Sequence, residues 1–77
     1  MVIKSLCELI PGDKGRIVKV RGSKIIHRRL RDMGLVAGSE IEVERKAPLG
    51  DPIEIKIKGY HLALRKEEAA GVGVEVD

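Results

Sequence analysis

The 77-residue chain is long enough for one domain, with 43% hydrophobic residues and a formal net charge of +3. Its one aromatic residue is a tyrosine, which excludes the usual aromatic-lined grooves for proline-rich peptides and base-stacking platforms for single-stranded nucleic acid. No apolar stretch approaches the about 20 residues that cross a bilayer, and the N-terminal segment lacks a signal peptide's apolar core. Together with a single cysteine, which cannot form an internal disulfide, this predicts a cytoplasmic protein.

The first part of the chain predicts a strand followed by a helix. Residues 16–20 (RIVKV) have the composition of a strand, which Gly22 interrupts. Ser23 is a good N-cap for a helix over 24–33, and Gly34 supplies the left-handed residue that ends it. Three apolar residues at helical spacing form the face that we expect to pack on the sheet: Ile26, Leu30 and Met33.

The second part of the chain predicts a series of short strands with in–out alternation. The expected elements are a strand over 40–45, a hairpin loop over 48–52, strands over 53–58 and 61–65, a helical turn over 66–70 and a strand over 72–76. Acidic residues on the strand over 40–45 and basic residues on the next strand suit ion pairs across the wet face. Five short strands with one inserted helix predict a mainly β fold, closed into a small barrel that removes exposed edges, with residues 1–77 as a single domain.

Basic residues gather in one stretch of the sequence. Eight of the fifteen Lys and Arg residues lie between Asp13 and Asp32, where there is no acidic residue. One end of the molecule is therefore expected to be positive and to attract a negatively charged partner. The candidate partner-binding residues on the solvent face of the predicted helix are Lys24, His27, Arg28 and Arg31. The alternative is an ordinary solvated helix face. Arg29 lies nearer the buried edge, where it could pair with Asp32 or lie along the sheet.

Two leucines beside turns are further candidates for partner binding. Leu35 follows the helix end, where it either closes the last turn as an apolar staple or projects as a knob for a partner groove. Leu49 lies in the segment over 48–52, whose prolines and glycine are typical of a turn. An exposed leucine at the tip of that hairpin would be a docking point, and a buried one would be structural. Both alternatives stay open for each leucine.

The chain offers little for metal binding or catalysis. Its soft or imidazole ligands are Cys7, His27 and His61, which lie on three predicted elements without paired spacing such as CxxC or HxxxH. No glycine-rich loop followed by Lys and Ser or Thr matches a phosphate-binding loop, and the chain has no threonine. No histidine stands in an interpretable order beside a Ser or Cys nucleophile. We therefore predict a binding protein rather than an enzyme, with no cofactor and no metal site.

Three segments together resemble the ferrous iron transport protein A (FeoA) family. They are the arginine-rich helix ending in RDMGL, the segment APLGDP between two strands, and the segment GYHLALR, and the resemblance runs from about Leu6 to the end of the chain. The resemblance implies an SH3-like barrel and a cytoplasmic role in ferrous iron uptake. It also implies a partner, a FeoB-like membrane transporter with a cytoplasmic guanine-nucleotide-binding domain, which the chain would modulate.

The alternative function is that of a small nucleic-acid-binding barrel that uses its basic helix face. The shortage of aromatic rings and the lack of a recognisable recognition helix argue against it. The sequence does not decide whether the chain activates or inhibits a transporter. It leaves weak self-association open, because an open barrel edge and the free Cys7 could support a dimer.

Overall fold

Six strands and three short helices make up residues 2–76, which are the residues that the computed structural model describes; Met1 and Asp77, the ends of the predicted domain, lie outside them. The strands are β1 (Val2–Ser5), β2 (Lys14–Val20), β3 (Glu40–Lys46), β4 (Ile53–Ile57), β5 (Tyr60–Leu64) and β6 (Val72–Val76). The helices are the 3₁₀ turn η1 (Leu6–Glu8), α1 (Lys24–Asp32) and α2 (Lys66–Ala69). Every strand and helix predicted from the sequence is present, with ends that differ by at most two residues.

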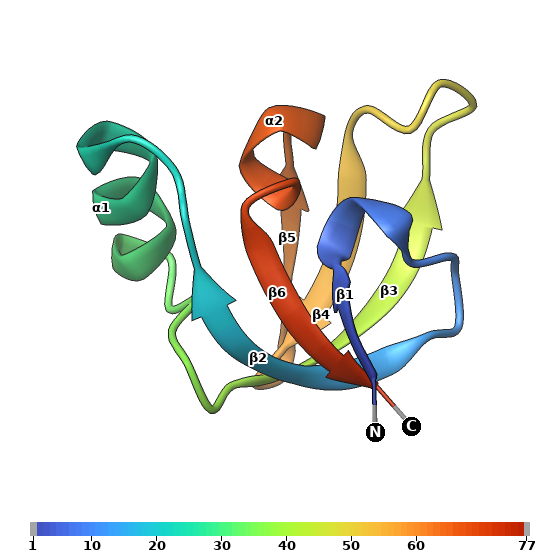
Figure 1. Ribbon diagram of the computed structural model, residues 1–77. Helices are drawn as coiled ribbons and strands as arrows, with labels where there is room; N and C mark the ends of the chain where they lie inside the picture. Colours follow the sequence, from blue (N-terminus) through green and yellow to red (C-terminus); the bar gives the residue numbers. More distant parts are fainter. Residues whose placement is uncertain (1, 77) are drawn as a thin grey trace.

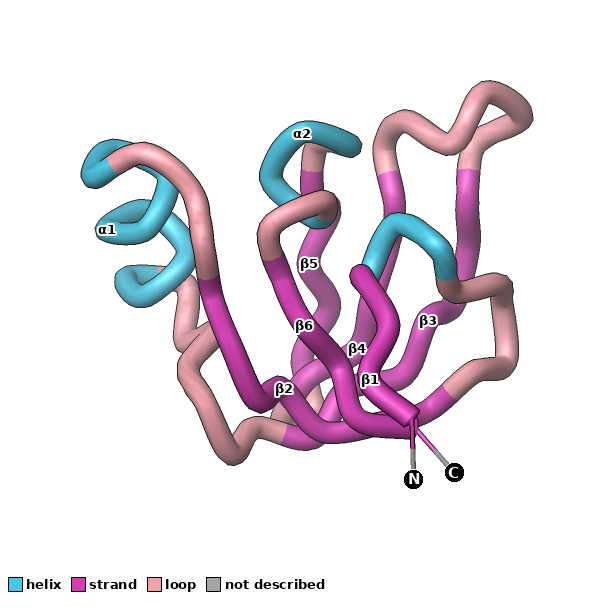
Figure 2. The backbone as a smooth tube through the Cα atoms, viewed as in Figure 1, coloured by secondary structure: helices cyan, strands magenta, loops and turns pink. Residues whose placement is uncertain are grey.

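All six strands belong to one antiparallel sheet with the spatial order β1-β6-β2-β3-β4-β5. The last strand of the chain therefore lies between the first two, which brings both ends of the chain to the same end of the molecule (Figure 1). The sheet curls strongly, with α1 beside the end of β2 and α2 above the curl (Figure 2). The predicted mainly β architecture is confirmed. However, among residues 2–76 no ladder joins β1 to β5, so the predicted closure of the sheet is wrong.

Strand β1, like the 3₁₀ turn η1, is an element that the sequence prediction missed. It pairs with β6, from Val2 opposite Val76 to Ser5 opposite Gly73. Its two large apolar residues, Val2 and Ile3, are both exposed. Because β1 has no alternation of buried and exposed side chains, only its backbone pairing with β6 defines it as a strand.

One apolar core fills the inside of the curled sheet. Alternation in β3 and β4 points their isoleucines and valine inward, as predicted. The buried apolar side chains are Leu6, Leu9, Ile17, Leu30, Leu35, Ile41, Val43, Ile53, Ile55, Ile57, Leu64, Ala69, Val72 and Val74. Each large aliphatic side chain buried in this way stabilises the fold by about 1.5–3 kcal/mol, so the core is the main source of stability.

Helix α1 begins where its capping residue predicts. The Oγ of Ser23 accepts a hydrogen bond from the backbone N–H of Ile26 at 3.2 Å. Such a cap typically contributes about 1 kcal/mol because it satisfies an otherwise free amide. The predicted apolar face of α1 packs on the core, with Leu30 buried and Ile26 and Met33 half-buried. The opposite face of α1 is therefore fixed toward solvent.

The end of α1 is a Schellman motif. Gly34 has a φ of +87°, and the N–H of Leu35 donates to the carbonyl oxygen of Leu30 at 2.9 Å. Tyr60 on β5 further stabilises this helix end, because its hydroxyl donates a hydrogen bond to the carbonyl oxygen of Met33 at 2.7 Å. A Cβ atom at Gly34 would approach that hydroxyl to 2.5 Å. Glycine is thus required at this position by both the backbone conformation and the close contact.

Candidate docking surface

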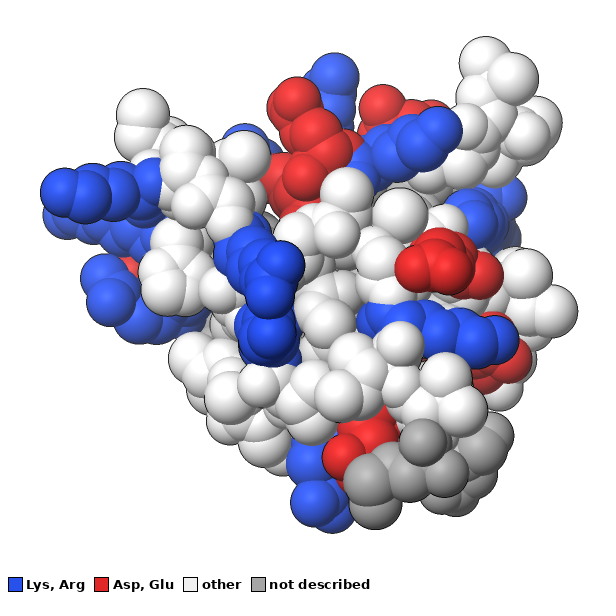
Figure 3. All heavy atoms as spheres, viewed as in Figure 1, with Lys and Arg blue, Asp and Glu red and all other residues white. Residues whose placement is uncertain are grey.

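The four predicted residues Lys24, His27, Arg28 and Arg31 all lie exposed on α1, and we call them the basic helix surface. In Figure 3, basic side chains gather over α1 on the left of the molecule, while acidic side chains lie over α2 at the top. Among residues 2–76, no carboxylate lies within 4.0 Å of the basic groups of Lys24, Arg28 or Arg31. The charge on this surface is therefore available to an external anion.

Several cations elsewhere on the molecule are already engaged. The contacts are Arg16–Glu40 at 3.8 Å, Arg45–Glu54 at 3.7 Å, Arg29–Glu68 at 3.2 Å, and Lys46 Nζ donating to the carbonyl oxygens of Cys7 at 2.7 Å and Leu9 at 3.2 Å. The lysine contacts tie η1 and its following residue to β3. A cation that already has an internal partner gains less from an external one, so these contacts separate structural cations from those of the basic helix surface.

The ion pair between Arg29 and Glu68 connects α1 to α2. The expected pairing of Arg29 with Asp32 is wrong, because the Oε2 of Glu68 lies 3.2 Å from the Nε of Arg29. The side chain of Glu68 is only 3% exposed, and its Oε1 accepts a hydrogen bond from the backbone N–H of Arg65 at 2.9 Å. A buried carboxylate requires such partners. The pair therefore holds Arg29 away from the basic helix surface and connects α1 to α2.

A groove runs between α1 and β2, and we call it the α1–β2 groove. It has a volume of about 240 Å³. Its aliphatic lining consists of Val18 and Val20 on β2 and of Leu35, Val36 and Ala37 on the loop after α1. Its polar lining is formed by Lys19, His27 and Arg31. Among residues 2–76, no acidic residue lines this groove.

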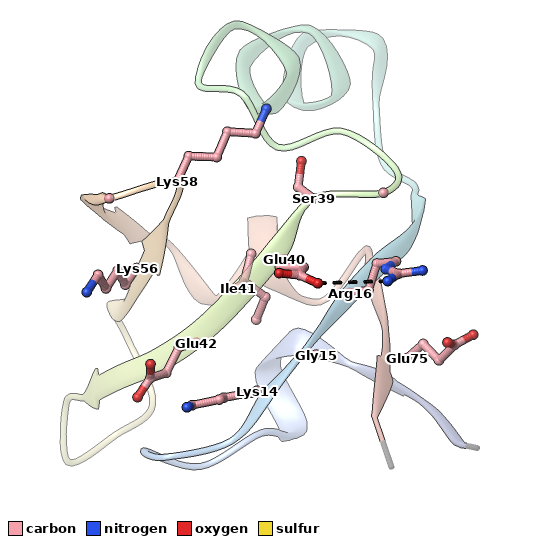
Figure 4. A pocket seen from close by; sticks show the side chains of 12 residues that line it. Lys14, Gly15, Arg16, Ser39, Glu40, Ile41, Glu42, Lys56, Lys58 and Glu75 are labelled. Atoms are coloured by element: carbon pink, nitrogen blue, oxygen red, sulfur yellow. Dashed lines mark ion pairs between the residues drawn. The ribbon is translucent and has the colours of Figure 1, made fainter.

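A larger, shallow depression of about 760 Å³ lies over β2, β3 and β4, and we call it the β2–β4 hollow (Figure 4). In the described part of the chain, residues 2–76, four cations and three carboxylates line it: Lys14, Arg16, Lys56, Lys58, Glu40, Glu42 and Glu75. The strand register sets Glu42 opposite both Lys14 and Lys56, as expected for cross-strand pairing on the wet face. The hollow is therefore nearly balanced in charge, and it lacks the predominantly apolar lining typical of a small-molecule site.

The two leucine candidates differ in their exposure to solvent. Leu35 is 1% exposed and closes the helix end as a staple, so the alternative of a projecting knob is wrong. It takes part in the α1–β2 groove only as part of its lining. Leu49 is 87% exposed at the tip of the hairpin between β3 and β4, far along the chain from α1. Leu49 thus has the accessibility that a docking point requires, but it does not line the α1–β2 groove.

Sequence reasoning did not single out three exposed residues near the basic helix surface. Ile25 is 80% exposed on α1, and Lys19 and Val36 line the α1–β2 groove. Ile25 could have been found, because it falls outside the helical spacing of the buried face. Lys19 and Val36 could not, because only the fold brings β2 and the loop after α1 to the same groove.

The three potential metal ligands of the sequence remain apart. Among the described residues 2–76, no group of three or more His, Cys, Asp or Glu side chains is arranged to hold a metal ion. The Nδ1 of His61 lies within hydrogen-bond distance of the Oε1 of Glu44, and the Sγ of Cys7 lies 3.1 Å from the Oγ of Ser5. Within the same part of the chain, none of the helices is long and apolar enough to cross a membrane.

The family assignment follows from comparison with known proteins. The model of the FeoA domain family matches residues 4–76. The chain belongs to the FeoA domain family. A curated relative, the Fe(2+) transport protein A/Fe(2+) transporter FeoB fusion protein of Porphyromonas gingivalis (strain ATCC BAA-308 / W83), is 42% identical over 71 residues. That match covers 92% of this chain and 8% of the fusion protein, so the chain spans a small part of that relative.

Solved structures extend this likeness to the fold. A FeoA-like protein from Clostridium acetobutylicum is 39% identical with a TM-score of 0.88, covering 99% of this chain and 88% of that one. FeoA from Stenotrophomonas maltophilia, solved in complex with zinc and described as an SH3 domain protein, is 32% identical with a TM-score of 0.80. That comparison covers 94% of this chain and 89% of the other. The predicted SH3-like architecture is thereby confirmed.

Proposed function

We propose that this FeoA-family chain is a cytoplasmic accessory protein of ferrous iron uptake, which binds the guanine-nucleotide-binding domain of a FeoB-like transporter and modulates it. The observation that carries the proposal is the relative in which transport protein A and the transporter FeoB form one polypeptide. Covalent fusion raises the effective concentration of two modules for each other, which suits modules that work in contact.

The basic helix surface supports this proposal as the contact. Its exposed cations lie on one rigid helix and, among residues 2–76, have no carboxylate partner for the Lys and Arg groups. Such a surface increases the rate of association with an acidic patch and fixes the orientation of the complex. The exposed Leu49 is a second contact candidate, on a different part of the molecule.

Modulation requires a difference in affinity between two states of the partner. A ligand shifts a conformational equilibrium only by as much as its affinities for the two states differ. We therefore expect the chain to bind the transporter's nucleotide-binding domain with different dissociation constants when that domain holds GDP and when it holds a GTP analogue. Equal dissociation constants for the two states would contradict modulation, although they would still show binding.

Isothermal titration of the chain with the isolated nucleotide-binding domain of the cognate FeoB-like transporter tests the proposal. A double-stranded oligonucleotide serves as the parallel ligand. We expect saturable binding to the domain and weak binding to the oligonucleotide. Sequence-independent, steeply salt-sensitive binding to the oligonucleotide, with no binding to the domain, would contradict the proposal and favour the nucleic-acid function instead.

A further inference from the structure

The α1–β2 groove combines an apolar lining with an unopposed basic rim. Val36 is 39% exposed, so part of an aliphatic side chain faces solvent inside the groove. Below it, Leu35 is buried and anchors the loop after α1 to the core. The lining is therefore a preformed apolar surface on a fixed support and does not need to reorganise on binding.

The volume of the groove limits what it can bind. Sites for drug-sized ligands and cofactors have volumes of about 300–1,000 Å³, and the groove, at about 240 Å³, is smaller. It has room for an aliphatic side chain of another protein but not for a nucleotide. The apolar lining favours such a side chain over a phosphate group, which would lose its hydration against valine and alanine.

The rim of the groove determines the charge of the partner. Lys19 approaches from β2, while His27 and Arg31 approach from α1. Among residues 2–76, no carboxylate lies within 4.0 Å of the basic groups of Lys19 or Arg31. Cations on both walls of the groove thus flank its apolar lining. A partner segment with acidic residues on both sides of an aliphatic residue would complement this arrangement.

We propose that the α1–β2 groove binds an acidic segment of the partner protein, with an aliphatic side chain of that segment seated between Val20 and Val36 and its carboxylates against Lys19 and Arg31. This inference rests on the proposed function, because the partner is the FeoB-like domain, and it adds the chemistry of the segment that is recognised. Recognition of this kind needs few residues, with one apolar anchor that supplies affinity and charges that supply register.

A nuclear magnetic resonance titration tests the chemistry of the groove. The isotope-labelled chain is mixed with a synthetic acetylated peptide in which a Leu-Leu pair is flanked by glutamates on both sides. A matched peptide carries Ser-Ser in place of Leu-Leu. We expect amide shifts to concentrate at residues 18–20, 31 and 35–37, and the serine peptide to bind at least about tenfold more weakly. Equal binding of the two peptides, or shifts that concentrate in the β2–β4 hollow, would overturn the proposal.

Two matched pairs of variants test whether the groove contributes to binding of the partner domain. Val36→Thr keeps the shape of the side chain and replaces one methyl group with a hydroxyl, and Val2→Thr makes the same change on exposed β1. Arg31→Gln removes a rim charge, and Lys58→Gln removes a charge from the β2–β4 hollow. All four positions lie outside the buried core, so we expect all four variants to fold. The groove variants should weaken binding to the FeoB-like domain by about threefold to tenfold, and the controls should leave it unchanged.

The outcomes of these experiments distinguish failure of the groove proposal from failure of the proposed function. If the wild-type chain binds the domain and both groove variants bind equally well, the groove proposal falls while the proposed function stands. If the wild-type chain does not bind the domain, the proposed function fails. If an oligonucleotide, but not the acidic leucine peptide, shifts the groove amides, the groove is a nucleic-acid contact and the proposal is overturned.

Discussion

The α1–β2 groove and the β2–β4 hollow differ in the way their charges are balanced. The hollow is about three times larger, at about 760 Å³ against about 240 Å³, yet its four cations face three carboxylates. The groove is lined by cations, and none of the described residues 2–76 that line it is acidic. The comparison indicates that the unpaired charge, rather than the size of the depression, distinguishes the surface available to a partner.

This difference in charge balance follows from the secondary structure on which the charged residues lie. In an antiparallel sheet the register places side chains directly opposite one another, so an acidic strand beside a basic one neutralises itself. Glu42 lies between Lys14 and Lys56 for this reason. Among residues 2–76, Arg29 is the one Lys or Arg of α1 whose basic group lies within 4.0 Å of a carboxylate, that of Glu68 on α2. A solvent-facing helix carries its charge without an opposing strand.

Removing the buried anchor of α1 should have the largest effect on stability. Leu30 is fully buried beneath the basic helix surface. Leu30→Ala should lower the free energy of unfolding by about 2–5 kcal/mol, because it leaves a cavity in the core. Urea denaturation measures the change. Ile25→Ala is the matched control on the exposed face and should change stability by less than about 0.5 kcal/mol. A similar loss in both variants would show that α1 is not anchored as described.

A side chain at Gly34 should distort the helix end that forms one wall of the groove. Gly34→Ala should destabilise the fold by about 1–3 kcal/mol, because it places a Cβ in a left-handed conformation and against the hydroxyl of Tyr60. In a Tyr60→Phe background the contact is removed, so the substitution should then be less destabilising. Thermal denaturation of the four proteins in this double-mutant cycle measures the coupling. Strictly additive effects would contradict the close contact.

The Arg29–Glu68 pair offers a test of which cations are structural. Arg29→Met should destabilise the fold by about 1–3 kcal/mol, because it leaves the buried carboxylate of Glu68 without its charge partner. Arg28→Met, next to it on the basic helix surface, should change stability by less than about 0.5 kcal/mol. Guanidinium denaturation compares the two variants. Equal losses would remove the distinction between structural and available cations.

The smallest expected effects have opposite signs in the two regions. Lys56→Glu places an acidic residue directly opposite Glu42, and the repulsion should destabilise the fold by up to about 1 kcal/mol. Lys24→Glu places an acid in the first turn of α1, where the helix dipole favours it, and should stabilise the fold by about 0.3–1 kcal/mol. Thermal denaturation at low and high salt measures both changes, which should shrink with screening. Two changes of the same sign would contradict the assigned charge environments.

Local signals in the sequence predicted most of the elements and the composition of the basic helix surface. Ser23 and Gly34 mark the ends of α1, and alternation marks β3 and β4, because these signals act over a few neighbouring residues. The exposed positions of Lys24, Arg28 and Arg31 follow from the helical period alone. The ends of α1 and its exposed positions can therefore be predicted without knowledge of the fold.

The rest depends on contacts between residues far apart in the chain. Strand β1 has no buried face, and only its ladder with β6 reveals it. The partner of Arg29 is Glu68, which lies on another helix and could not be inferred from spacing. The α1–β2 groove likewise needs β2 and the loop after α1 to meet. Pairings of this kind are set by the packing of the whole sheet rather than by local propensity.

Binding of two charge-reversed pairs to the FeoB-like nucleotide-binding domain tests the central claim most directly. Arg28→Glu/Arg31→Glu reverses two charges on the basic helix surface, and Lys56→Glu/Lys58→Glu reverses two charges in the β2–β4 hollow. Titration calorimetry should show the first pair weakening binding by about tenfold or more, because like charges then meet across the interface. The second pair should bind within about twofold of the wild-type chain. Loss of binding only in the second pair would contradict the account and assign docking to the hollow.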